Sequence, residues 1–281
     1  MILIADSGGT KVDWTLIDGK EIVRRIKSPG MNAMMLSQQE MSETIKKEVV
    51  PQIPEYEKVE KIYFYGAGCL GPTIDKVKEA LVDNFPNAKA DVNSDLLAAA
   101  RSLCGDQPGI ACIIGTGSNT CFYDGEKIMK NVPALGYILG DEGSGAVLGR
   151  LLISDVFKNQ LPENLCEKFK ERYQLDIPTV VEKVYRQPFA NKFLASVTPF
   201  LLEHIEEPAI HRLVLNNFKQ FFIRNITQYA DYRNLKVNVT GSIGWYYRDV
   251  LKEAAEAMDC TLGKITASPM EGLIEYHCNK G

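Results

Sequence analysis

A carboxylate, two glycines and a hydroxyl occur together near the N-terminus, in the run Asp6-Ser7-Gly8-Gly9-Thr10-Lys11. Glycine lets backbone N–H groups approach an anion without a Cβ in the way. The Thr10 hydroxyl adds a donor, and Asp6 can hold Mg²⁺ through water molecules, because Mg²⁺ dehydrates reluctantly. The run therefore predicts a phosphate-binding turn with a metal at Asp6. The alternative is an ordinary hairpin turn with a solvated aspartate.

Two more glycine turns have a similar character, Gly115-Thr116-Gly117-Ser118-Asn119 and Thr240-Gly241-Ser242-Ile243-Gly244. The first pairs naturally with the N-terminal turn as a clamp on the β- and γ-phosphates of a nucleotide. The second lies between an expected strand and helix, where helix N-terminal amides can face an α-phosphate and ribose. The alternatives are unrelated hairpins and a tight connection. The chain contains no G-x-x-x-x-G-K-[ST] phosphate loop.

Two aspartates stand at the expected starts of helices. Asp95, in Asn93-Ser94-Asp95, could cap a helix or act as the general base for a hydroxyl that attacks a γ-phosphate. Asp141, in Gly140-Asp141-Glu142-Gly143-Ser144, could likewise cap a helix or bind substrate hydroxyls. Both alternatives stay open on the sequence alone.

The elements that must hold these residues form a duplicated pattern. Apolar alternation predicts strands at 2–5, 12–17 and 21–27, and again at 110–114, 119–123 and 127–130. Each set is a three-stranded antiparallel meander with a glycine turn at its first corner and an Asp-Gly hairpin at its second. Asp18 and Asp124, in the two hairpins, are 106 residues apart. We therefore expect an internal duplication with one copy in each of two domains.

Alternating strands and helices follow each meander, which predicts parallel pairing. Strands are expected at 61–65, 88–92, 236–240 and 262–266, and helices at 73–85, 95–104, 141–157, 244–258 and 268–278. Residues 161–233 are helical and strand-poor, with five prolines as punctuation.

Composition sets outer limits on function. Hydrophobic residues make up 45% of the 281-residue chain and charged residues 24%, which is typical of a folded domain and excludes disorder. The net charge of −4 makes nucleic acid and anionic membranes unexpected partners. With no long apolar run and no signal-peptide pattern, we expect a cytoplasmic protein. Seven cysteines without a C-x-x-C pair, and three histidines, indicate reduced thiols and no zinc centre.

The order of these motifs resembles that of the sugar-kinase/heat-shock-chaperone/actin superfamily. The combination of GTGSN at 115–119 and GDEGS at 140–144 is most similar to the N-acetylglucosamine kinase branch and the related BadF/BadG/BcrA/BcrD ATPase family. The resemblance extends from Ile2 to about Ile274. It implies an α/β fold of two duplicated ribonuclease-H-like (actin-like ATPase) domains, with a nucleotide cleft between them.

The resemblance also implies roles for individual residues. Asp95 matches the catalytic base, and Asp6 the metal-binding position. The positions that match nucleotide-binding ones are Asp6, Gly8, Gly9, Thr10, Lys11, Gly115, Thr116, Gly117, Gly241 and Ser242. Those that match sugar-contacting ones are Asn32, Asp95, Ser118, Asn119, Gly136 and Asp141. Leu135 stands where these kinases usually carry a tryptophan, and the proline that often follows the residue matching Asn32 is absent.

The implied activity is the ATP- and Mg²⁺-dependent phosphorylation of an amino sugar, most of all N-acetylglucosamine at its 6-hydroxyl. A non-kinase ATPase that acts on a protein partner, and a nucleotide-binding regulator without catalysis, remain as alternatives. We expect one ATPase-type domain at 1–106, with the helix of 268–281 packed back on it. The second is expected at 107–267, with the helical insertion at about 161–233. Hinges are expected near 105–109 and 267–269, and a homodimer is an option.

Overall fold

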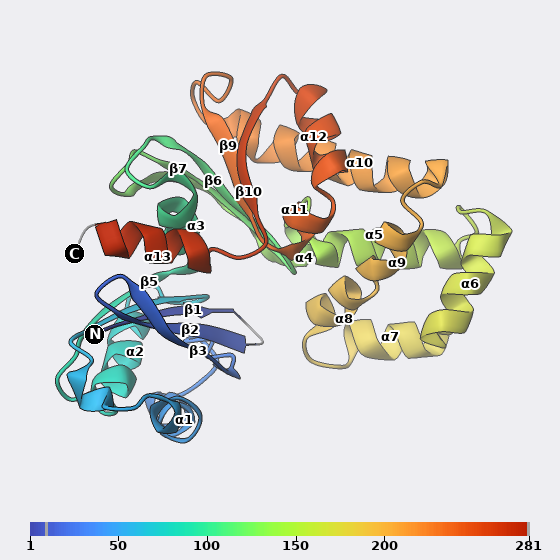
Figure 1. Ribbon diagram of the computed structural model, residues 1–281. Coiled ribbons are helices and arrows are strands. Elements are labelled where there is room, and N and C mark those ends of the chain that lie inside the picture. Colours follow the sequence, from blue (N-terminus) through green and yellow to red (C-terminus); the bar gives the residue numbers. More distant parts are fainter. Residues whose placement is uncertain (9–10, 280–281) are drawn as a thin grey trace. The chain divides into compact units, whose positions relative to one another are not determined.

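The computed structural model describes residues 1–8 and 11–279, and the chain divides into two compact units. Unit 1 comprises Met1–Gly105 and Pro269–Gly281, and unit 2 comprises Asp106–Ser268. Each unit contains one five-stranded mixed sheet with helices beside it (Figure 1). The fold is therefore α/β, with one sheet per unit, as the duplicated strand pattern predicts. No helix in the described part of the chain is long and apolar enough to cross a membrane.

Unit 1 has the strand order β3-β2-β1-β4-β5. The strands are β1 Ile2–Ser7, β2 Lys11–Asp18, β3 Glu21–Pro29, β4 Lys61–Gly66 and β5 Lys89–Ser94. β1, β2 and β3 pair antiparallel, while β1, β4 and β5 pair parallel. The predicted meander and the predicted parallel extension are both confirmed.

Helices cover both faces of this sheet. They are α1 Gln38–Thr44, α2 Thr73–Val82, α3 Asp95–Cys104 and α13 Met270–Asn279, with a short π-helix, η1 Ile45–Val49, and two 3-10 helices, η2 Val50–Gln52 and η3 Tyr56–Lys58. α1 and α2 enclose a core with Leu3 and Phe64. On the opposite face, α3 and α13 enclose a smaller core with Ile4, Tyr65 and Leu273. The last helix of the chain thus completes the first unit (Figure 1).

Unit 2 repeats the arrangement in the order β10-β9-β6-β7-β8. The strands are β6 Gly109–Ile114, β7 Ser118–Tyr123, β8 Ile128–Val132, β9 Lys236–Thr240 and β10 Thr261–Thr266. Again the first three pair antiparallel, and β6, β9 and β10 pair parallel. The second meander is therefore confirmed as well.

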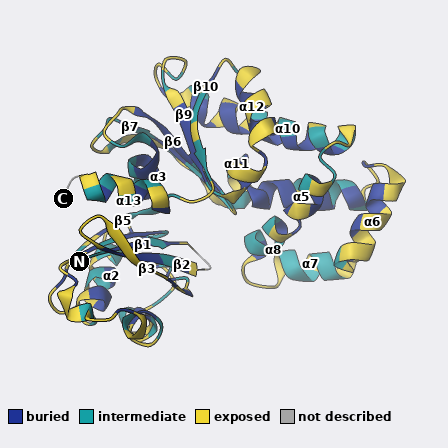
Figure 2. Ribbon diagram, in the orientation of Figure 1, coloured by how far each residue is buried: buried dark blue, intermediate teal, exposed yellow. Residues whose placement is uncertain are grey.

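The helices of unit 2 are more numerous. They are α4 Gly136–Leu139, α5 Gly145–Phe157, α6 Glu163–Tyr173, α7 Ile177–Tyr185, α8 Ala190–Ser196, α9 Thr198–Glu203, α10 Pro208–Arg224, η4 Ile226–Gln228, α11 Ser242–Tyr246 and α12 Arg248–Glu256. A single hydrophobic core joins β6, α5, α10 and α12. The helices are buried where they face this core and exposed on their outer turns (Figure 2). The helical stretch at 161–233 is as predicted.

Two predicted helices differ from the observed ones. The helix expected at 141–157 begins only at Gly145, because Ser144 caps it through a 3.2 Å bond from the Val147 N–H. The helix expected at 244–258 is two helices separated at Tyr247, whose hydroxyl donates to the Thr198 carbonyl over 2.6 Å. Both differences arise from local capping or tertiary contacts, which hydrophobic periodicity does not register.

Candidate functional site

In unit 1, the candidate residues gather where parallel strands end. Strand register aligns Asp6 with Tyr65 and Asn93, so Asp6 lies one residue from the carboxyl edge of the sheet. Asp95 follows the last residue of β5 directly. Because the carboxyl ends of parallel strands share one edge, Asp6 and Asp95 come close enough for their charges to interact.

Asp95 is the first residue of α3 but does not cap it. Ser94 is the N-cap, and its hydroxyl oxygen accepts from the Leu97 N–H over 3.2 Å. The Asp95 carboxylate accepts instead from the Leu96 N–H over 2.9 Å. Burial raises the pKa of Asp95 above its ordinary value. The capping alternative for Asp95 is therefore wrong, and the side chain is a carboxylate held in one orientation at the sheet edge.

Asp6 lies among other carboxylates. Its pKa is raised to about 7, mainly by burial and also by the charges of Asp95 and Asp13, while Lys11 opposes the rise. Lys11 itself pairs with Asp13, with 2.6 Å between Nζ and Oδ2. An excess of negative charge at a partly enclosed edge is the environment that a divalent cation would neutralise.

The donor set fits Mg²⁺ better than an ion held by many protein ligands. Among the described residues, no three His, Cys, Asp or Glu side chains form a metal-binding group. Mg²⁺ keeps several waters and takes oxygen ligands from phosphates, so it needs only one or two carboxylates from a protein. Asp6, with Asp13 and Asp95 nearby, meets that smaller requirement.

The rest of the first turn is described only in part. The Gly8 N–H donates to the Lys11 carbonyl over 3.0 Å and closes the β1–β2 hairpin. Gly9 and Thr10, which were expected to contact phosphate, lie outside the described residues.

Asn32 belongs to the loop after β3 and is positioned by its own turn. Its Oδ1 accepts from the Met34 N–H over 2.9 Å. Gly68, with φ of +78°, approaches so closely that a Cβ there would lie 2.8 Å from this Oδ1. Because Gly68 has no side chain, the loop that follows β4 leaves space for the Asn32 amide.

In unit 2, the second glycine turn rests on a helix. The carbonyls of Gly115 and Thr116 accept from the N–H groups of Gly145 and Ala146, over 2.8 and 3.0 Å. These are the first two amides of α5, which would otherwise lack partners. The turn is thereby fixed to the α5 N-terminus, and its remaining surface belongs to Gly117 and to the side chain of Thr116.

Asp141 lies against this turn. A Cβ on Gly117 would lie 3.0 Å from its Oδ2, and the Ser118 N–H donates to its carboxylate. The pKa of Asp141 is raised to about 6, mainly by burial and also by the charge of Glu142, while the bond from the Ser118 N–H lowers it. Its φ of 54° is left-handed, and Ser144 caps α5. The capping alternative for Asp141 is therefore wrong too.

The other expected sugar positions of unit 2 lie on neighbouring segments. The Ser118 hydroxyl donates to the Glu142 carbonyl over 2.7 Å. The Asn119 Oδ1 accepts from the Thr120 N–H and from Asn131 Nδ2, over 3.0 and 2.9 Å. Gly136, with φ of 73°, has open space where a Cβ would be. Asp141 and Ser118 are thus joined by a hydrogen bond, and Asn119 follows Ser118 in β7. Gly136 is the first residue of α4, the short helix that precedes the Asp141 loop.

The third glycine turn joins β9 to α11. Gly241 has φ of 119°, and a Cβ there would lie 2.5 Å from the Ile114 carbonyl oxygen, so only glycine fits. Ser242 is exposed and borders a cavity of about 390 Å³ that is also lined by Thr198, Ile243 and Tyr246. The expected nucleotide position Ser242 therefore opens onto a cavity of unit 2.

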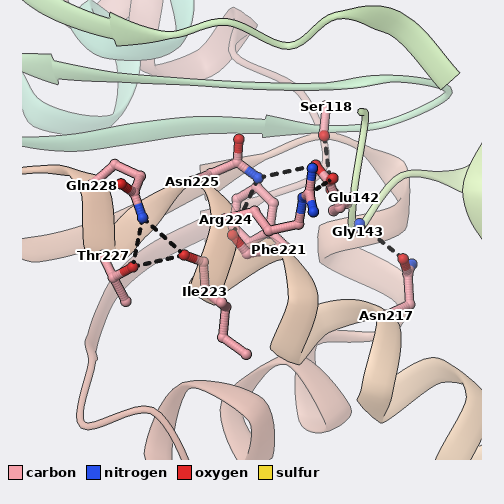
Figure 3. Close-up of polar contacts among 10 residues, drawn as sticks. All are labelled: Ser118, Glu142, Gly143, Asn217, Phe221, Ile223, Arg224, Asn225, Thr227 and Gln228. Carbon is pink, nitrogen blue, oxygen red and sulfur yellow. Dashed lines mark hydrogen bonds and ion pairs between the residues drawn. The ribbon is translucent and has the colours of Figure 1, made fainter. Parts of the chain in front are cut away.

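Sequence reasoning missed several residues of both sites. Asn93 has a buried Nδ2 without a partner among the described residues. Burial and, to a lesser extent, the charge of Asp95 raise the pKa of the Cys69 thiol. Glu142 is bound by Arg224 and Asn225 from α10, far along the chain (Figure 3). Two local signals could have indicated the first group: the Asn93-Ser94-Asp95 run for Asn93 and the Gly66-Ala67-Gly68 run for Cys69. No local pattern indicates the Arg224 contact.

Comparisons with known proteins agree with the fold. No family model matches the chain, and no curated protein matches it. A solved structure of a candidate N-acetylglucosamine kinase from Porphyromonas gingivalis is 45% identical, with 99% of each chain covered and a TM-score of 0.96.

More distant solved structures have the same fold. A candidate N-acetylglucosamine kinase from Chromobacterium violaceum is 17% identical, with 98% of each chain covered and a TM-score of 0.74. A glucokinase of the ROK family from Streptomyces griseus, in complex with glucose and AMPPNP, is 12% identical over 100% of this chain and 99% of its own, with a TM-score of 0.58. The fold agrees with that of these kinases, and the identity to the Porphyromonas gingivalis structure is 45% over essentially the whole length. The chain therefore belongs to the N-acetylglucosamine kinase-like family of sugar kinases with the actin-like ATPase fold.

Proposed function

We propose that the chain is an ATP-dependent kinase that phosphorylates an amino sugar, N-acetylglucosamine at its 6-hydroxyl. Membership of a sugar-kinase family supports a phosphotransferase with an alcohol acceptor. The observation that carries the proposal furthest is the pair of carboxylates at the edge of the first sheet, Asp95 and Asp6, of which Asp95 does not cap its helix.

Asp95 is proposed as the general base. Its carboxylate has a fixed orientation from the Leu96 N–H, and burial brings its pKa upward, toward the range in which a base accepts a proton effectively. It would accept the proton of the attacking 6-hydroxyl. Phosphoryl transfer otherwise requires positioning and charge stabilisation more than covalent chemistry.

Asp6 is proposed to hold Mg²⁺, with Gly8, Gly9, Thr10 and Lys11 at the phosphate turn. Mg²⁺, when bound, would neutralise charge on the nucleotide phosphates. Gly115, Thr116 and Gly117, together with Gly241 and Ser242, are proposed to hold the rest of the nucleotide. The close approach at Gly241 and the anchoring of the 115–117 turn on α5 support a fixed backbone at both places.

Sugar hydroxyls require both donors and acceptors at fixed positions. We assign this role to Asn32 in unit 1 and to Ser118, Asn119, Gly136 and Asp141 in unit 2. Asp141 accepts hydrogen bonds best when ionised, and its pKa of about 6 leaves it ionised at neutral pH.

A coupled assay of ADP release tests the proposal. Wild-type protein with Mg²⁺-ATP should release ADP only when an acceptor from a panel of hexoses and amino sugars is present, fastest with N-acetylglucosamine. Asp95→Asn should lower kcat by about 10²–10⁴-fold while ATP still binds. Asp75→Asn is the matched control, because Asp75 also lies in the first turn of a helix but is exposed, and it should retain full activity.

Each other outcome has its own meaning. ADP release that is equally fast without sugar would contradict the kinase and favour a switch ATPase. Nucleotide binding without any turnover would favour a regulator. Near-normal kcat in Asp95→Asn would remove Asp95 as the base, even if sugar-dependent turnover is found.

A further inference from the structure

We propose that Glu142 and Arg224 form a charge clamp through which helix α10 positions the sugar-binding loop at Asp141 and balances the charge beside that carboxylate. The inference rests on the proposed role of Asp141 in sugar binding and adds two positioning residues that do not touch the sugar. All of the contacts that carry it lie within unit 2 (Figure 3).

The central contact is an ion pair between the loop and the end of α10. Arg224 Nε lies 2.5 Å from Glu142 Oε1, and the Glu142 side chain is only 17% exposed. Asn225 Nδ2 lies 3.4 Å from the second oxygen of the same carboxylate. Two neighbouring residues at the end of α10 thus hold both oxygens of Glu142, which immediately follows Asp141.

The same face of α10 holds the next residue of the loop. The Gly143 N–H donates to Asn217 Oδ1 over 3.1 Å, and a Cβ on Gly143 would lie 3.0 Å from the Cβ of Phe221. Asn217 is buried, and its Nδ2 has no partner in the described part of the chain. A buried donor without a partner is unfavourable for the folded state. The Asn217 side chain is therefore explained better by its hydrogen bond with the Gly143 N–H than by a gain in the stability of the core.

Strand β7 holds the loop from the other side. The Ser118 hydroxyl donates to the Glu142 carbonyl over 2.7 Å, and the Ser118 N–H donates to the Asp141 carboxylate. The Asp141 carboxylate is therefore placed between β7 and a loop that α10 anchors at two consecutive residues. Loss of the α10 contacts would leave the loop held by β7 and by backbone bonds such as that from the Asp141 N–H to the Ala134 carbonyl, 3.1 Å long.

The clamp also controls the charge around Asp141. In the described part of unit 2, the groups around its carboxylate are Glu142 on its own loop, the Ser118 N–H from β7 and Gly117 from the turn before it. α10 contributes Arg224, which acts through Glu142. Glu142 contributes to the raised pKa of Asp141, and Arg224 places a positive charge against Glu142. Removal of either partner should therefore change the protonation of Asp141 in opposite directions.

Two charge variants separate this role from simple support of the fold. Both Arg224→Gln and Glu142→Gln release the loop, so both should raise KM for the sugar more than they lower kcat, by up to about 100-fold in kcat/KM. In Arg224→Gln the uncompensated Glu142 should move the acid limb of the pH profile of kcat/KM to higher pH. In Glu142→Gln that limb should move to lower pH. Arg224→Lys should restore much of the profile.

The control is Lys219→Gln on the same helix, which changes the charge equally but has no ion pair with the loop in the described structure. It should leave KM for the sugar and kcat unchanged. A readout independent of catalysis is the pKa of the Asp141 carboxyl, followed by ¹³C NMR and identified by its loss in Asp141→Asn. It should rise in Arg224→Gln and fall in Glu142→Gln, in variants whose melting temperatures show that they are folded.

The outcomes distinguish this inference from the proposed function. Shifts of the Asp141 pKa in the same direction, or no shift in either variant, would overturn the clamp even in an active sugar kinase. Opposite shifts in a protein without sugar-dependent turnover would support the clamp and contradict the proposed function.

Discussion

Asp6 shows how much of a side chain's behaviour depends on neighbours that are distant in the sequence. The glycine turn reveals the residue itself, but the causes of its raised pKa are burial at the sheet edge, the charge of Asp95 at the start of α3 and that of Asp13 on the partner strand. Asp13 lies directly opposite Asp6 in the β1–β2 pairing. Like charges in this position are unfavourable, so an ionised Asp6 should work against the folded state.

A stability measurement tests this at residue scale. The pKa of Asp6 is about 7 in the folded protein against 3.8 ordinarily, so between these values the folded state binds more protons than the unfolded one. Stability should therefore fall as the pH rises through this window. Asp6→Asn should be more stable than wild type at pH 8, with the difference vanishing toward pH 4.

The comparison requires melting temperatures at both pH values, with and without Mg²⁺. The control Asp18→Asn, at an exposed strand end, should show no such pH dependence. Mg²⁺ should stabilise wild type at pH 8 but not Asp6→Asn. A difference between Asp6→Asn and wild type that is equal at both pH values would contradict the assigned cause.

At residue scale the sequence indicates which side chains are chemically suited to a site, but it does not indicate which other residues they contact. Asp95 and Asp141 could be chosen because a carboxylate after a strand or in a glycine-rich loop is chemically useful, yet both also fit a helix cap. Ser94 and Ser144 settle that choice, because each is the actual cap one residue before its helix. Serine and aspartate have similar capping preferences, so adjacent candidates cannot be ranked without coordinates.

Among the elements, α5 connects the loop at 140–144 to the helical stretch at 161–233. Gly149, in the middle of α5, lies so close to α8 that a Cβ there would be 1.8 Å from the Leu194 carbonyl oxygen. Glycine in a helix interior costs about 1 kcal/mol relative to alanine. Its presence here is explained by the contact between the two helices.

Gly149→Ala should therefore destabilise the protein although it improves helix propensity. We expect a loss of roughly 1–3 kcal/mol in the free energy of unfolding, which is typical of overpacking. Denaturant unfolding provides the measurement. The neighbouring exposed residue gives the control, since Arg150→Ala should change the free energy by less than about 0.5 kcal/mol. A Gly149→Ala protein as stable as wild type would show that α8 can move away at little cost.

Element prediction succeeded where pattern and local chemistry agree. Both meanders follow from alternation and Asp-Gly turns, and the parallel strands follow from strand–helix alternation. It failed for residues 244–258, where apolar spacing suggests one helix. There a Cβ on Gly244 would lie only 2.5 Å from Val239 Cγ1, and the Tyr247 hydroxyl donates to the Thr198 carbonyl. Tertiary contacts of this kind override periodicity.

Across the whole molecule, the two units differ in how the chain builds them. Unit 2 is one continuous segment with its own core, while unit 1 needs both the beginning and the end of the chain. Met270 and Leu273 of α13 are buried with Ile4 and Tyr65 of the sheet. The Tyr65 hydroxyl also bonds to His277 Nε2 over 2.8 Å. The last helix is thus part of the first unit's core.

A chain truncated after Ser268 should lose stability in unit 1 alone. Hydrogen exchange followed by mass spectrometry should show faster exchange in β1, β4 and α3, because their apolar contacts with α13 are gone. Peptides of β6, α5 and α10 should exchange as in the intact chain. Equal deprotection of both units would show that the two unfold as one cooperative body. As a milder control, Glu271→Gln breaks only the exposed ion pair with Arg25 and should change little.

The discontinuity of unit 1 has a consequence for biosynthesis. As the ribosome delivers the chain from its N-terminus, residues 2–105 emerge first but lack α13, which covers one face of their sheet. Residues 106–268 emerge as a continuous segment and can fold as soon as they leave the exit tunnel. The second unit is therefore in a position to mature before the first, and Asp6 and Asp95 acquire their final surroundings only after the helix at 270–279 has been translated. A stalled or prematurely terminated chain would present an incomplete first unit to chaperones and proteases.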